Sequence, residues 1–501
     1  MRKFYITTPI YYVNDRPHIG HAYATFSADT IARYHRLIGE PTMFLTGTDE
    51  NAEKNVESAT AAGETDVQHY IDRMSALWQV TWDELGISND DFIRTTEERH
   101  LRGVEKFWQA VEQSGDIYKG QYEGLYCIGC EAFYRESDLT PEGLCPLHKR
   151  KPELVKEENY FFRVSKYKDA LLRYHNEHPT FAAPASRRQE VLRYITDHLE
   201  DVSISRTAKG WGIPVPGDAS QVIYVWFDAL INYLTAVGYG TDDETFAKWW
   251  PADMHLVGKD IIKFHCALWP AMLLSAGLPL PAQVFAHGFF TISEEKISKS
   301  LGNAIDPRDL VETYGVDALR YFLLREIPFG GDGDFSIERL AGRYDSDLAS
   351  GLGNYVSRIL ALTKGVEMLT VGNDLKVVFD ETWKSYHRHF AANEPGRVLE
   401  VIWQVLKEGD RYIDECAPWA LKKDAEKTDE LAVVLGTLIE SLRQLAWLLT
   451  PFMPETAMKI FTSLGWQDEL KRSLTEASVW GAQTHGPVVA TTDPLFPRLT
   501  A

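Results

Sequence analysis

The sequence predicts an α/β fold in which a parallel sheet covered by helices is interrupted by an insertion and followed by an all-α helical bundle. Three observations predict it. Strand-like and helix-like runs alternate up to about residue 290, a turn-rich, aromatic stretch with clustered cysteines breaks that alternation, and after Ile337 the pattern is helical almost without a break. Alternation of this kind is typical of parallel sheets, and sustained helical periodicity is typical of bundles.

The first strand and the first helix are expected at the N-terminus. Residues 3–8 are rich in β-formers, and from Ala22 apolar residues recur at helical spacings. A second strand, 42–46, is followed closely by Asp49. Because ligands of parallel α/β sheets bind at the carboxyl ends of strands, the turn at 15–21 and Asp49 are candidate site segments.

The alternation stops near Ile117 and resumes after residue 217, which indicates one α/β domain of the Rossmann type with an inserted module. Further strands are expected at 221–227, 254–257 and 283–287. In the helical region, apolar residues recur at intervals of three and four, as in an amphipathic helix, at Leu431, Val434, Leu438, Leu442, Leu445 and Leu449. The predicted parts are 1–116 and 218–290 for the α/β domain, 117–217 for the insertion, 291–345 for a linking region and 346–501 for the helical domain.

The composition is that of an ordinary globular protein, with 45% hydrophobic and 25% charged residues in a chain of 501. The chain has no run of eighteen apolar residues, and its N-terminus lacks the pattern of a signal peptide, so we expect a cytoplasmic protein with no membrane association. A net charge of −20 argues mildly against polyanion binding, since affinity for phosphate backbones rests on lysine and arginine. Local basic patches such as 149–151 are compatible with that average.

Three of the five cysteines lie close together, at Cys127, Cys130 and Cys145. The first pair alone is ambiguous between redox and metal chemistry. A second pair with the same spacing, Cys145 and His148, makes the set match a closed tetrahedral zinc site of Cys₃His type. We therefore expect one structural Zn²⁺ in the insertion, where it would contribute to the folding of a small module.

The turn that holds His18, Gly20 and His21 permits three interpretations: a metal site, a phosphate site or a turn without a functional role. A spacing of three without an adjacent glutamate disfavours zinc. At the start of a helix, the backbone N–H groups and the helix dipole attract anions, and Gly20 lets a ligand approach the backbone. The sequence favours phosphate over metal, while a turn without a role stays open on this segment alone.

A second cationic segment lies far downstream, with Lys296, Lys299 and Ser300 followed by a glycine. Its lysines and hydroxyl groups suit a triphosphate, although the segment taken alone reads equally well as a solvated charged loop. The chain contains no Gly-x-x-x-x-Gly-Lys-Ser/Thr phosphate loop. A shared ATP would give both the histidine turn and the lysine segment a purpose.

Together the two segments resemble the paired signature of class I aminoacyl-tRNA synthetases. The flanking sequence is similar to the methionyl-tRNA synthetase family along nearly the whole chain, and the matching segments are 8–14, 46–50, 158–163, 224–229, 258–261 and 264–273. Two positions depart from the family pattern. Ile297 stands where methionine is commonest in the lysine segment, and Asn51 and Ala52 stand where many relatives have His-Gly.

The resemblance implies a methionine–tRNA ligase that uses ATP with Mg²⁺ to convert L-methionine to methionyl-adenylate, with release of diphosphate. Transfer to the 3′ end of tRNA(Met), including initiator tRNA, then releases AMP and supplies translation initiation and elongation. It implies His18, His21, Lys296 and Lys299 as catalytic phosphate contacts, Lys299 foremost. The implied ATP site comprises His18, Gly20, His21, Gly258, Asp260, Lys296, Lys299 and Ser300.

The resemblance also implies a methionine pocket. An apolar, aromatic pocket suits a polarizable thioether, and a carboxylate suits the substrate's ammonium group. Its implied members are Ile10, Tyr12, Asp49, Trp226, Ala229, Leu230, Tyr233, Ile261 and His265. Without the resemblance, aromatic residues such as Trp226 and Tyr233 would more readily be interpreted as core residues.

In the helical region the resemblance implies an anticodon site at Asn354, Arg358, Pro418 and Trp419. A spacing of four places the first two on one helix face, and a tryptophan offers a plane for an unstacked base. Locally, a polar surface pair and an interface tryptophan explain the same residues. The chain has no room for an appended dimerising module, so a monomer is expected.

Two other function classes share part of this pattern. A non-synthetase nucleotidyltransferase would share the histidine turn but lack the zinc insertion and the helical domain. An inactive tRNA-binding paralogue is disfavoured because both histidines and both lysines are present.

Overall fold

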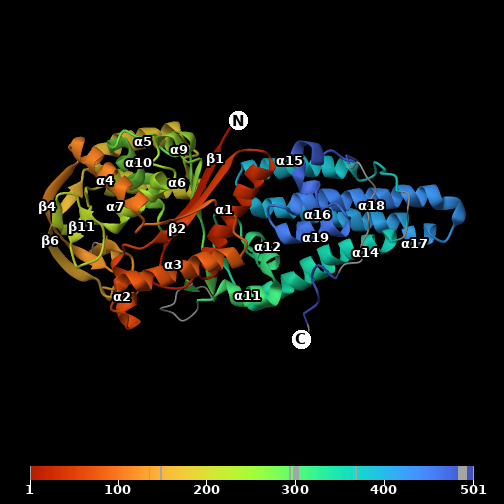
Figure 1. The fold of residues 1–501 in the computed structure, drawn as a ribbon, viewed down its shortest axis with the longest axis horizontal. Coiled ribbons are helices and arrows are strands. Elements are labelled where there is room, and N and C mark those ends of the chain that lie inside the picture. The colour runs from red at the N-terminus through yellow and green to blue at the C-terminus, as the bar shows by residue number, and fades with distance from the viewer. Residues whose placement is uncertain are drawn as a thin grey trace.

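The structure is a computed structural model that describes residues 2–134, 136–146, 149–292, 295–296, 304–364, 366, 369–482 and 493–499. The molecule is elongated (Figure 1), with the sheet-containing half at one end and a helical bundle at the other. The predicted fold class, a parallel α/β sheet with an insertion followed by a helical domain, is confirmed.

The main sheet has six strands in the order β3-β2-β1-β12-β13-β7, and neighbouring strands are parallel throughout. Such an order requires helical crossovers, which is why helices lie on both faces. The strands are β1 Phe4–Tyr12, β2 Thr42–Asp49, β3 Asp91–Arg94, β7 Ala182–Ala183, β12 Met254–Gly258 and β13 Val284–His287.

The two faces of the sheet bury separate cores. Along β1, Phe4 and Ile6 belong to one apolar cluster and Tyr5 belongs to another, as expected when successive strand residues point to opposite faces. The first cluster contains residues of α1 Ile19–Leu37, α3 Val67–Glu84 and α12 Val316–Glu326. The second contains residues of α4 Glu98–Gln113 and α10 Trp269–Ser275.

The strands predicted at 3–8, 42–46, 254–257 and 283–287 are confirmed in this sheet. The strand predicted at 221–227 is wrong. Strand β11 ends at Ile223 in a separate antiparallel sheet with β9 and β10, and helix α7 begins at Val225. A short continuous apolar run does not distinguish a buried strand from a buried helix, and here it spans the junction of the two.

The insertion is built around a four-stranded sheet of order β5-β4-β6-β8, in which the long antiparallel pair β4 Ile117–Cys127 and β6 Glu153–Phe162 forms the main part. One part of the range 117–217 belongs to the main sheet, because β7 pairs in parallel with β13. The other α-helices and strands up to residue 249, within the insertion and on either side of it, are α2 Glu53–Ala61, β5 Ala132–Tyr134, α5 Lys168–Glu177, α6 Ala185–His198, β8 Val202–Ser203, β9 Ser205–Thr207, β10 Pro214–Val215, β11 Asp218–Ile223, α7 Val225–Ala229, α8 Asn232–Thr235 and α9 Asp243–Trp249.

A short hairpin and two helices connect the sheet to the bundle. They are β14 Phe290–Ile292, β15 Glu295–Lys296, α11 Pro307–Tyr314 and α12, with β16 Gly333–Asp334 pairing beside β14. The bundle helices are α13 Ile337–Arg343, α14 Asn354–Thr363, α15 Lys376–Ala391, α16 Pro395–Cys416, α17 Pro418–Leu421, α18 Thr428–Leu449, α19 Pro454–Ser463 and α20 Leu474–Ala477.

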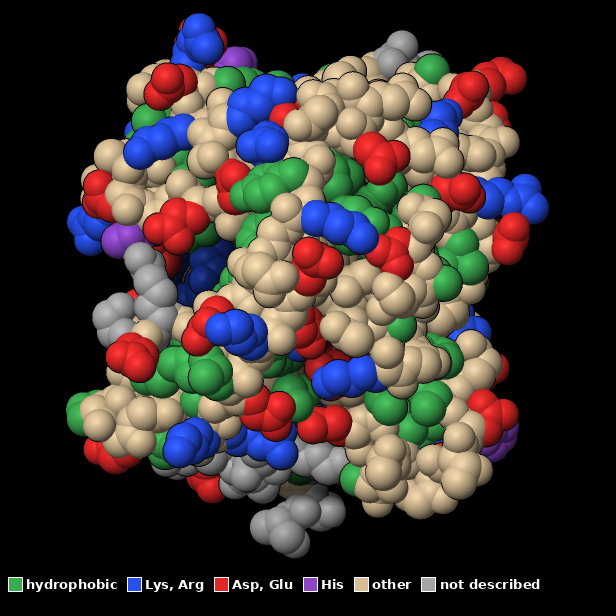
Figure 2. Space-filling model, turned by 90° about the vertical axis from the view of Figure 1, so that its left-hand side faces the viewer, with side chains coloured by type: hydrophobic (Ala, Val, Ile, Leu, Met, Phe, Trp, Pro, Cys, Tyr) green, Lys and Arg blue, Asp and Glu red, His purple; other side chains and the backbone are tan. Residues whose placement is uncertain are grey.

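Helix α18 is the centre of the bundle, and the predicted apolar stripe is buried in its core. Within the part of the chain that the structure describes, Ala425–Leu449 is the one stretch that is long and apolar enough to cross a membrane. Because 83% of its apolar window is buried among the other bundle elements, it is explained as a core helix. The opposite end of the molecule carries acidic and basic side chains interspersed around a recess (Figure 2).

Candidate active site

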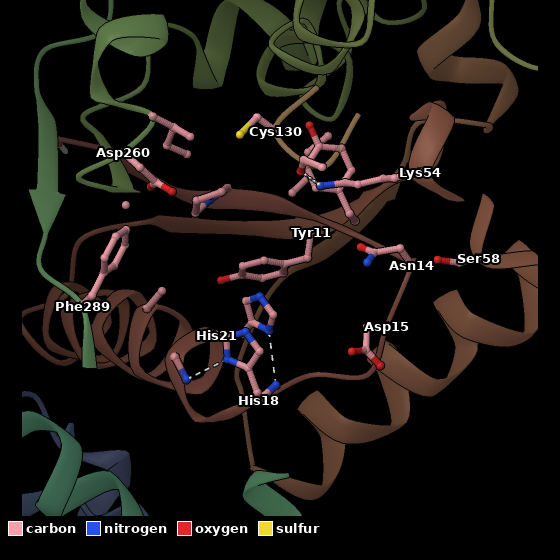
Figure 3. A pocket seen from close by; sticks show the side chains of 18 of the residues that line it. Tyr11, Asn14, Asp15, His18, His21, Lys54, Ser58, Cys130, Asp260 and Phe289 are labelled. Carbon is pink, nitrogen blue, oxygen red and sulfur yellow. Dashed lines mark hydrogen bonds between the residues drawn. The ribbon is translucent and has the colours of Figure 1, made fainter. Parts of the chain in front are cut away.

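A cavity of about 1160 Å³ opens at the carboxyl ends of the central strands of the main sheet. Tyr12 ends β1, Gly258 ends β12 and His287 ends β13, and all three line it. The start of α1 and the face of α2 form two further walls (Figure 3). Ligands of parallel α/β sheets bind at this edge, so the cavity is the candidate active site.

The two histidines cap helix α1, whose first residue is Ile19. His18 is the N-cap residue, and its Nδ1 accepts a hydrogen bond from the Gly20 N–H at 3.1 Å. His21 Nδ1 accepts one from the His18 N–H at 3.2 Å, so each histidine satisfies a backbone donor of the first turn (Figure 3). The imidazole rings are stacked with their centroids 3.6 Å apart.

This capping fixes which ring nitrogen carries the proton. A nitrogen that accepts a hydrogen bond from an N–H group is unprotonated, so in the neutral imidazoles the proton is on Nε2. His18 and His21 therefore offer Nε2–H donors at the positive end of a helix dipole, which suits an anionic ligand. At Gly20 a Cβ atom would lie 3.0 Å from the His18 imidazole, so a side chain there would crowd the cap.

The lysine segment begins beside the cavity. Lys296 ends β15 and pairs in antiparallel register with Thr291 of β14, and Phe290 of the same strand lines the cavity. The predicted Lys299 and Ser300 lie outside the described residues.

The remaining predicted ATP residues lie at the end of β12. Gly258 and Asp260 both line the cavity. A Cβ atom at Gly258 would meet Asp260 Oδ1 at 2.8 Å, so glycine lets the aspartate side chain lie close to the strand end.

The predicted methionine residues form a wall and a layer behind it. Ile10, Tyr12, Trp226 and Ile261 line the cavity. Ala229, Leu230, Tyr233 and His265 do not line it and are buried behind the wall.

Tyr233 and His265 are held by a defined hydrogen-bond chain. His265 Nδ1 lies 3.1 Å from the Ile261 carbonyl and donates to it, so Nε2 accepts from the Tyr233 hydroxyl at 2.8 Å. Burial lowers the pKa of His265 to about 4, so the ring is neutral at pH 7. Trp226, which stacks on Phe264 with centroids 4.0 Å apart, completes a rigid aromatic wall.

Asp49 ends β2 beside Tyr12 of β1 and is buried. Burial raises the pKa of its carboxyl well above the ordinary value, and the charge of Lys54 opposes that rise. Its Oδ1 has no hydrogen-bond partner within the described structure. A buried carboxylate in this state is a candidate ligand for a cationic group.

Several cavity residues were not predicted from the sequence, and Lys54 is the most informative of them. It lies in the first turn of α2 with its Nζ 3.2 Å from the ring centroid of Tyr12, a cation–π contact. A lysine in the helix that follows a predicted ligand-binding strand end was the available signal. Tyr11 and Trp78, whose ring centroids are 4.9 Å apart, also line the cavity. The sequence carries no signal for this pair, because their contact joins β1 to α3.

The three predicted thiol ligands come together. The Sγ atoms of Cys127, Cys130 and Cys145 lie within 4.8 Å of one another, and those of Cys130 and Cys145 are 3.4 Å apart. At a Zn–S distance of about 2.3 Å, tetrahedral sulfur ligands lie roughly 3.8 Å apart, so the donor set fits a metal ion. His148 lies outside the described residues. The Cys127–Cys130 turn also reaches the active site, since Gly129 and Cys130 line the cavity.

The predicted anticodon residues lie on the helical bundle. Asn354, the first residue of α14, is exposed, and Arg358 one turn later donates to Asp410 and Asp414 of α16 at 2.9 Å each. Trp419 is 46% exposed, whereas Pro418 is buried. Asp414 is five residues before Trp419, so Arg358 and the tryptophan are at the same end of α16.

Known families match this chain along almost its whole length. A model described as tRNA synthetases class I (M) matches residues 4–149 and 139–360, and a model described as the anticodon binding domain of methionyl tRNA ligase matches residues 362–501. These matches give no support to the alternatives of a non-synthetase nucleotidyltransferase or an inactive paralogue.

Similar proteins carry the same description. A methionine–tRNA ligase of Thermotoga maritima is 46% identical over 100% of this chain and 81% of its own. One of Bacillus subtilis is 46% identical over 99% of this chain and 78% of its own. One of Streptomyces coelicolor is 42% identical over 99% of this chain and 97% of its own.

Two solved structures of Mycobacterium tuberculosis methionyl-tRNA synthetase are also similar. The complex with methionyl-adenylate has a TM-score of 0.94 at 40% identity and covers 99% of this chain and 100% of that one. The free-state structure has a TM-score of 0.86 at 37% identity, covering 100% and 99%.

Proposed function

The chain belongs to the methionine–tRNA ligase family of class I aminoacyl-tRNA synthetases, and from that premise we propose how its residues activate methionine and transfer it to the 3′ end of tRNA(Met). The observation that carries the proposal is one cavity that joins the histidine-capped start of α1 to the aromatic wall of Tyr12 and Trp226. ATP binds at the first and methionine at the second.

Methionine is held by two kinds of contact. Its thioether side chain packs against the wall of Ile10, Tyr12, Trp226 and Ile261, with Ala229, Leu230, Tyr233 and His265 as the rigid layer behind. Its ammonium group binds to Asp49. The buried carboxylate needs a cation and the apolar wall needs a thioether, so the pocket recognises both ends of the amino acid.

Activation joins the methionine carboxylate to the α-phosphorus of ATP and breaks the bond from that phosphorus to diphosphate. His18 and His21 donate their Nε2–H groups to phosphate oxygens, and the dipole of α1 adds to the stabilisation of charge. Gly258 and Asp260 bind the nucleoside, and Lys296, Lys299 and Ser300 bind the phosphates. Mg²⁺ bound with ATP would neutralise charge on the departing diphosphate.

Cys127, Cys130, Cys145 and His148 hold one structural Zn²⁺. Bound there, Zn²⁺ would fix the Cys127–Cys130 turn, of which Gly129 and Cys130 line the cavity. Asn354, Arg358, Pro418 and Trp419 bind the anticodon. Transfer of the methionyl group releases AMP.

The domain division predicted from the sequence also belongs to this proposal; the two family models meet near residue 361, whereas the predicted helical domain begins at residue 346. A monomeric state, a cytoplasmic location and use of initiator tRNA also belong to it. Analytical ultracentrifugation and aminoacylation of initiator tRNA test the first and the last.

The decisive experiment is pyrophosphate exchange into ATP with a panel of amino acids. Exchange driven by methionine alone is the expected result, and exchange driven by another amino acid overturns the assignment. Lys299→Ala is expected to slow exchange about a hundredfold while methionine binding is retained, because such a donor contributes mainly in the transition state. An unchanged rate would remove Lys299 from the mechanism.

A further inference from the structure

A second buried carboxylate, Asp228, lies close enough to Asp49 for the two charges to interact. Asp228 lies in α7 and is 0% exposed, and Asp49 is 3% exposed. The Oδ1 atom of each has no hydrogen-bond partner in the described part of the chain. Because buried polar atoms in native proteins are nearly always paired, two such oxygens in one place indicate a donor group that binds there.

The two carboxylates are linked through Asn51. Its Nδ2 donates to Asp228 Oδ2 at 2.9 Å, and the residue follows Asp49 by two positions. Both carboxylates adjoin residues that line the cavity, since Tyr12 pairs with Asp49 across the strands and Trp226 is two positions before Asp228 in α7. Asn51 therefore supplies Asp228 with a neutral amide donor.

A third buried acceptor near Asp49, on Asn55, indicates which kind of ligand these side chains suit. Asn55 Nδ2 donates to the Asp49 carbonyl at 3.0 Å, while the Oδ1 atom of Asn55 is buried without a partner in the described structure. Three acceptors without donors require a group with several N–H bonds, and two of the three are carboxylate oxygens. An ammonium group, with three donors and a positive charge, meets that requirement.

The charged groups around the pair leave it short of positive charge. Burial raises the pKa of Asp228 well above its usual value, and the Asp49 carboxylate raises it further. Around Asp49, Lys54 is the cation, while Glu131 and Glu50 add negative charge. Glu50 is itself bound by Arg94 at 2.8 Å. The neighbouring tyrosines, Tyr12 and Tyr233, stay neutral because burial raises the pKa of each.

We propose that Asp228 is a second recognition residue of the methionine site, and that Asp49 and Asp228 share one proton in the empty site and release it when the α-ammonium group of methionine binds between them. The inference rests on the proposed methionine site. Two close carboxylates in a buried site do not both ionise readily, and a bound cation removes that obstacle. One carboxyl O–H bond breaks, the proton passes to solvent, and no covalent bond forms.

The test is calorimetric titration of methionine into the full chain between pH 6 and pH 8, in buffers of different ionisation enthalpy. The wild-type chain is expected to release up to one proton per methionine and to bind more tightly as the pH rises. Asp228→Asn is expected to abolish both effects and, at pH 8, to bind methionine about tenfold or more weakly, because a hydrogen bond to a charged group is lost. Asp243→Asn, at an exposed carboxylate of α9, is the matched control.

A second ligand separates recognition from folding. The deaminated analogue 4-(methylthio)butanoate carries the thioether but no ammonium group, so Asp228→Asn is expected to bind it at least as well as the wild-type chain does. If Asp228→Asn binds neither ligand, it has not folded. The number of protons that the wild-type chain releases per methionine bound then tests the proposal. No proton release by the wild-type chain, or unchanged methionine binding by Asp228→Asn at every pH, overturns the proposal. Both results differ from failure of the proposed function, in which methionine drives no exchange at all.

Discussion

The guanidinium of Arg320 and the carboxylate of Asp29 form an ion pair, with Nη2 2.6 Å from Oδ2, and neither side chain is exposed to solvent. Asp29 lies on α1, the helix whose first turn holds the two histidines. Arg320 lies on α12 and also donates to the carbonyl groups of Pro451 and Phe452, between α18 and α19. The pair therefore fixes the histidine-bearing helix against the bundle.

Asp29→Asn is expected to lower the free energy of unfolding by about 3–5 kcal/mol, because it leaves a buried guanidinium without its counter-charge. Burial alone would raise the pKa of Asp29, but the charges of Arg320 and Arg33 hold it at about 2. Because the pKa of Asp29 is lower in the folded chain than in the unfolded chain, where it is near 4, the ionised carboxylate stabilises the fold above about pH 4. This contribution is lost as the pH falls towards 2. Urea unfolding at pH 7 measures the loss, which should be constant between pH 6 and pH 8.

The control for this pair is Lys384→Gln, at an ion pair with Glu381 whose side chains are both mostly exposed. It is expected to change stability by less than about 0.5 kcal/mol, as surface pairs usually do. A loss below about 1 kcal/mol for Asp29→Asn would contradict the importance assigned to the buried pair.

Two substitutions at His18 separate its capping role from its phosphate role. Asparagine is a good N-cap residue without an imidazole Nε2–H, whereas alanine lacks both functions. His18→Ala is expected to lose about 1 kcal/mol of stability and His18→Asn only a few tenths. Both are expected to slow pyrophosphate exchange on the order of a hundredfold. Exchange at the wild-type rate in His18→Asn would show that the histidine serves α1 only as a cap.

The sequence predicted the strands and helices with strong periodicity and misjudged the junctions. The apolar run 221–227 contains the end of β11 and the start of α7, because Tyr224 serves as an N-cap that no preferred capping residue signals. The helix predicted from Ala22 begins at Ile19, and this difference makes His18 a cap and places His21 in the first turn. Periodicity counts apolar residues, so it starts a helix late where the first turn is polar.

The site was predictable where its residues are adjacent in sequence and unpredictable where they meet only in space. The thiols of Cys127, Cys130 and Cys145 follow from spacing alone, and their proximity is confirmed. Asp29 and Arg320 are 291 positions apart, and Asn51 and Asp228 are 177 apart. Nothing local marks either pairing, because it is created by the crossover connections of the sheet.

Replacement of Cys145 by serine is expected to abolish the binding of one zinc ion per chain, since a closed site needs all four ligands. It is also expected to raise the KM for methionine in pyrophosphate exchange. The reason is geometric: Glu131, which follows the Cys127–Cys130 turn, accepts a hydrogen bond from the Lys54 N–H at 2.9 Å, and Lys54 lies over the ring of Tyr12. Elemental analysis and exchange kinetics measure the two effects.

Cys416→Ser is the matched control, because that cysteine lies in the bundle away from the cluster. It should keep both the zinc and the KM. Zinc retained in Cys145→Ser would show that this thiol is not a ligand, and zinc lost with an unchanged KM would separate the metal from the methionine pocket.

Trp419→Ala is expected to weaken tRNA(Met) binding while leaving methionine-dependent pyrophosphate exchange unchanged, since the exposed indole lies on the bundle and not in the cavity. Stacking of a base on an aromatic side chain contributes about 1–3 kcal/mol, so the KM for tRNA should rise roughly five- to a hundredfold.

Arg358→Gln should have a further effect, because it releases Asp410 and Asp414 from their ion pairs and adds uncompensated negative charge near the tRNA. Val377→Ala, at an apolar residue of α15 that is 69% exposed, provides the control and should leave both steps unchanged. Equal tRNA kinetics in Trp419→Ala and Val377→Ala would exclude the tryptophan from anticodon binding.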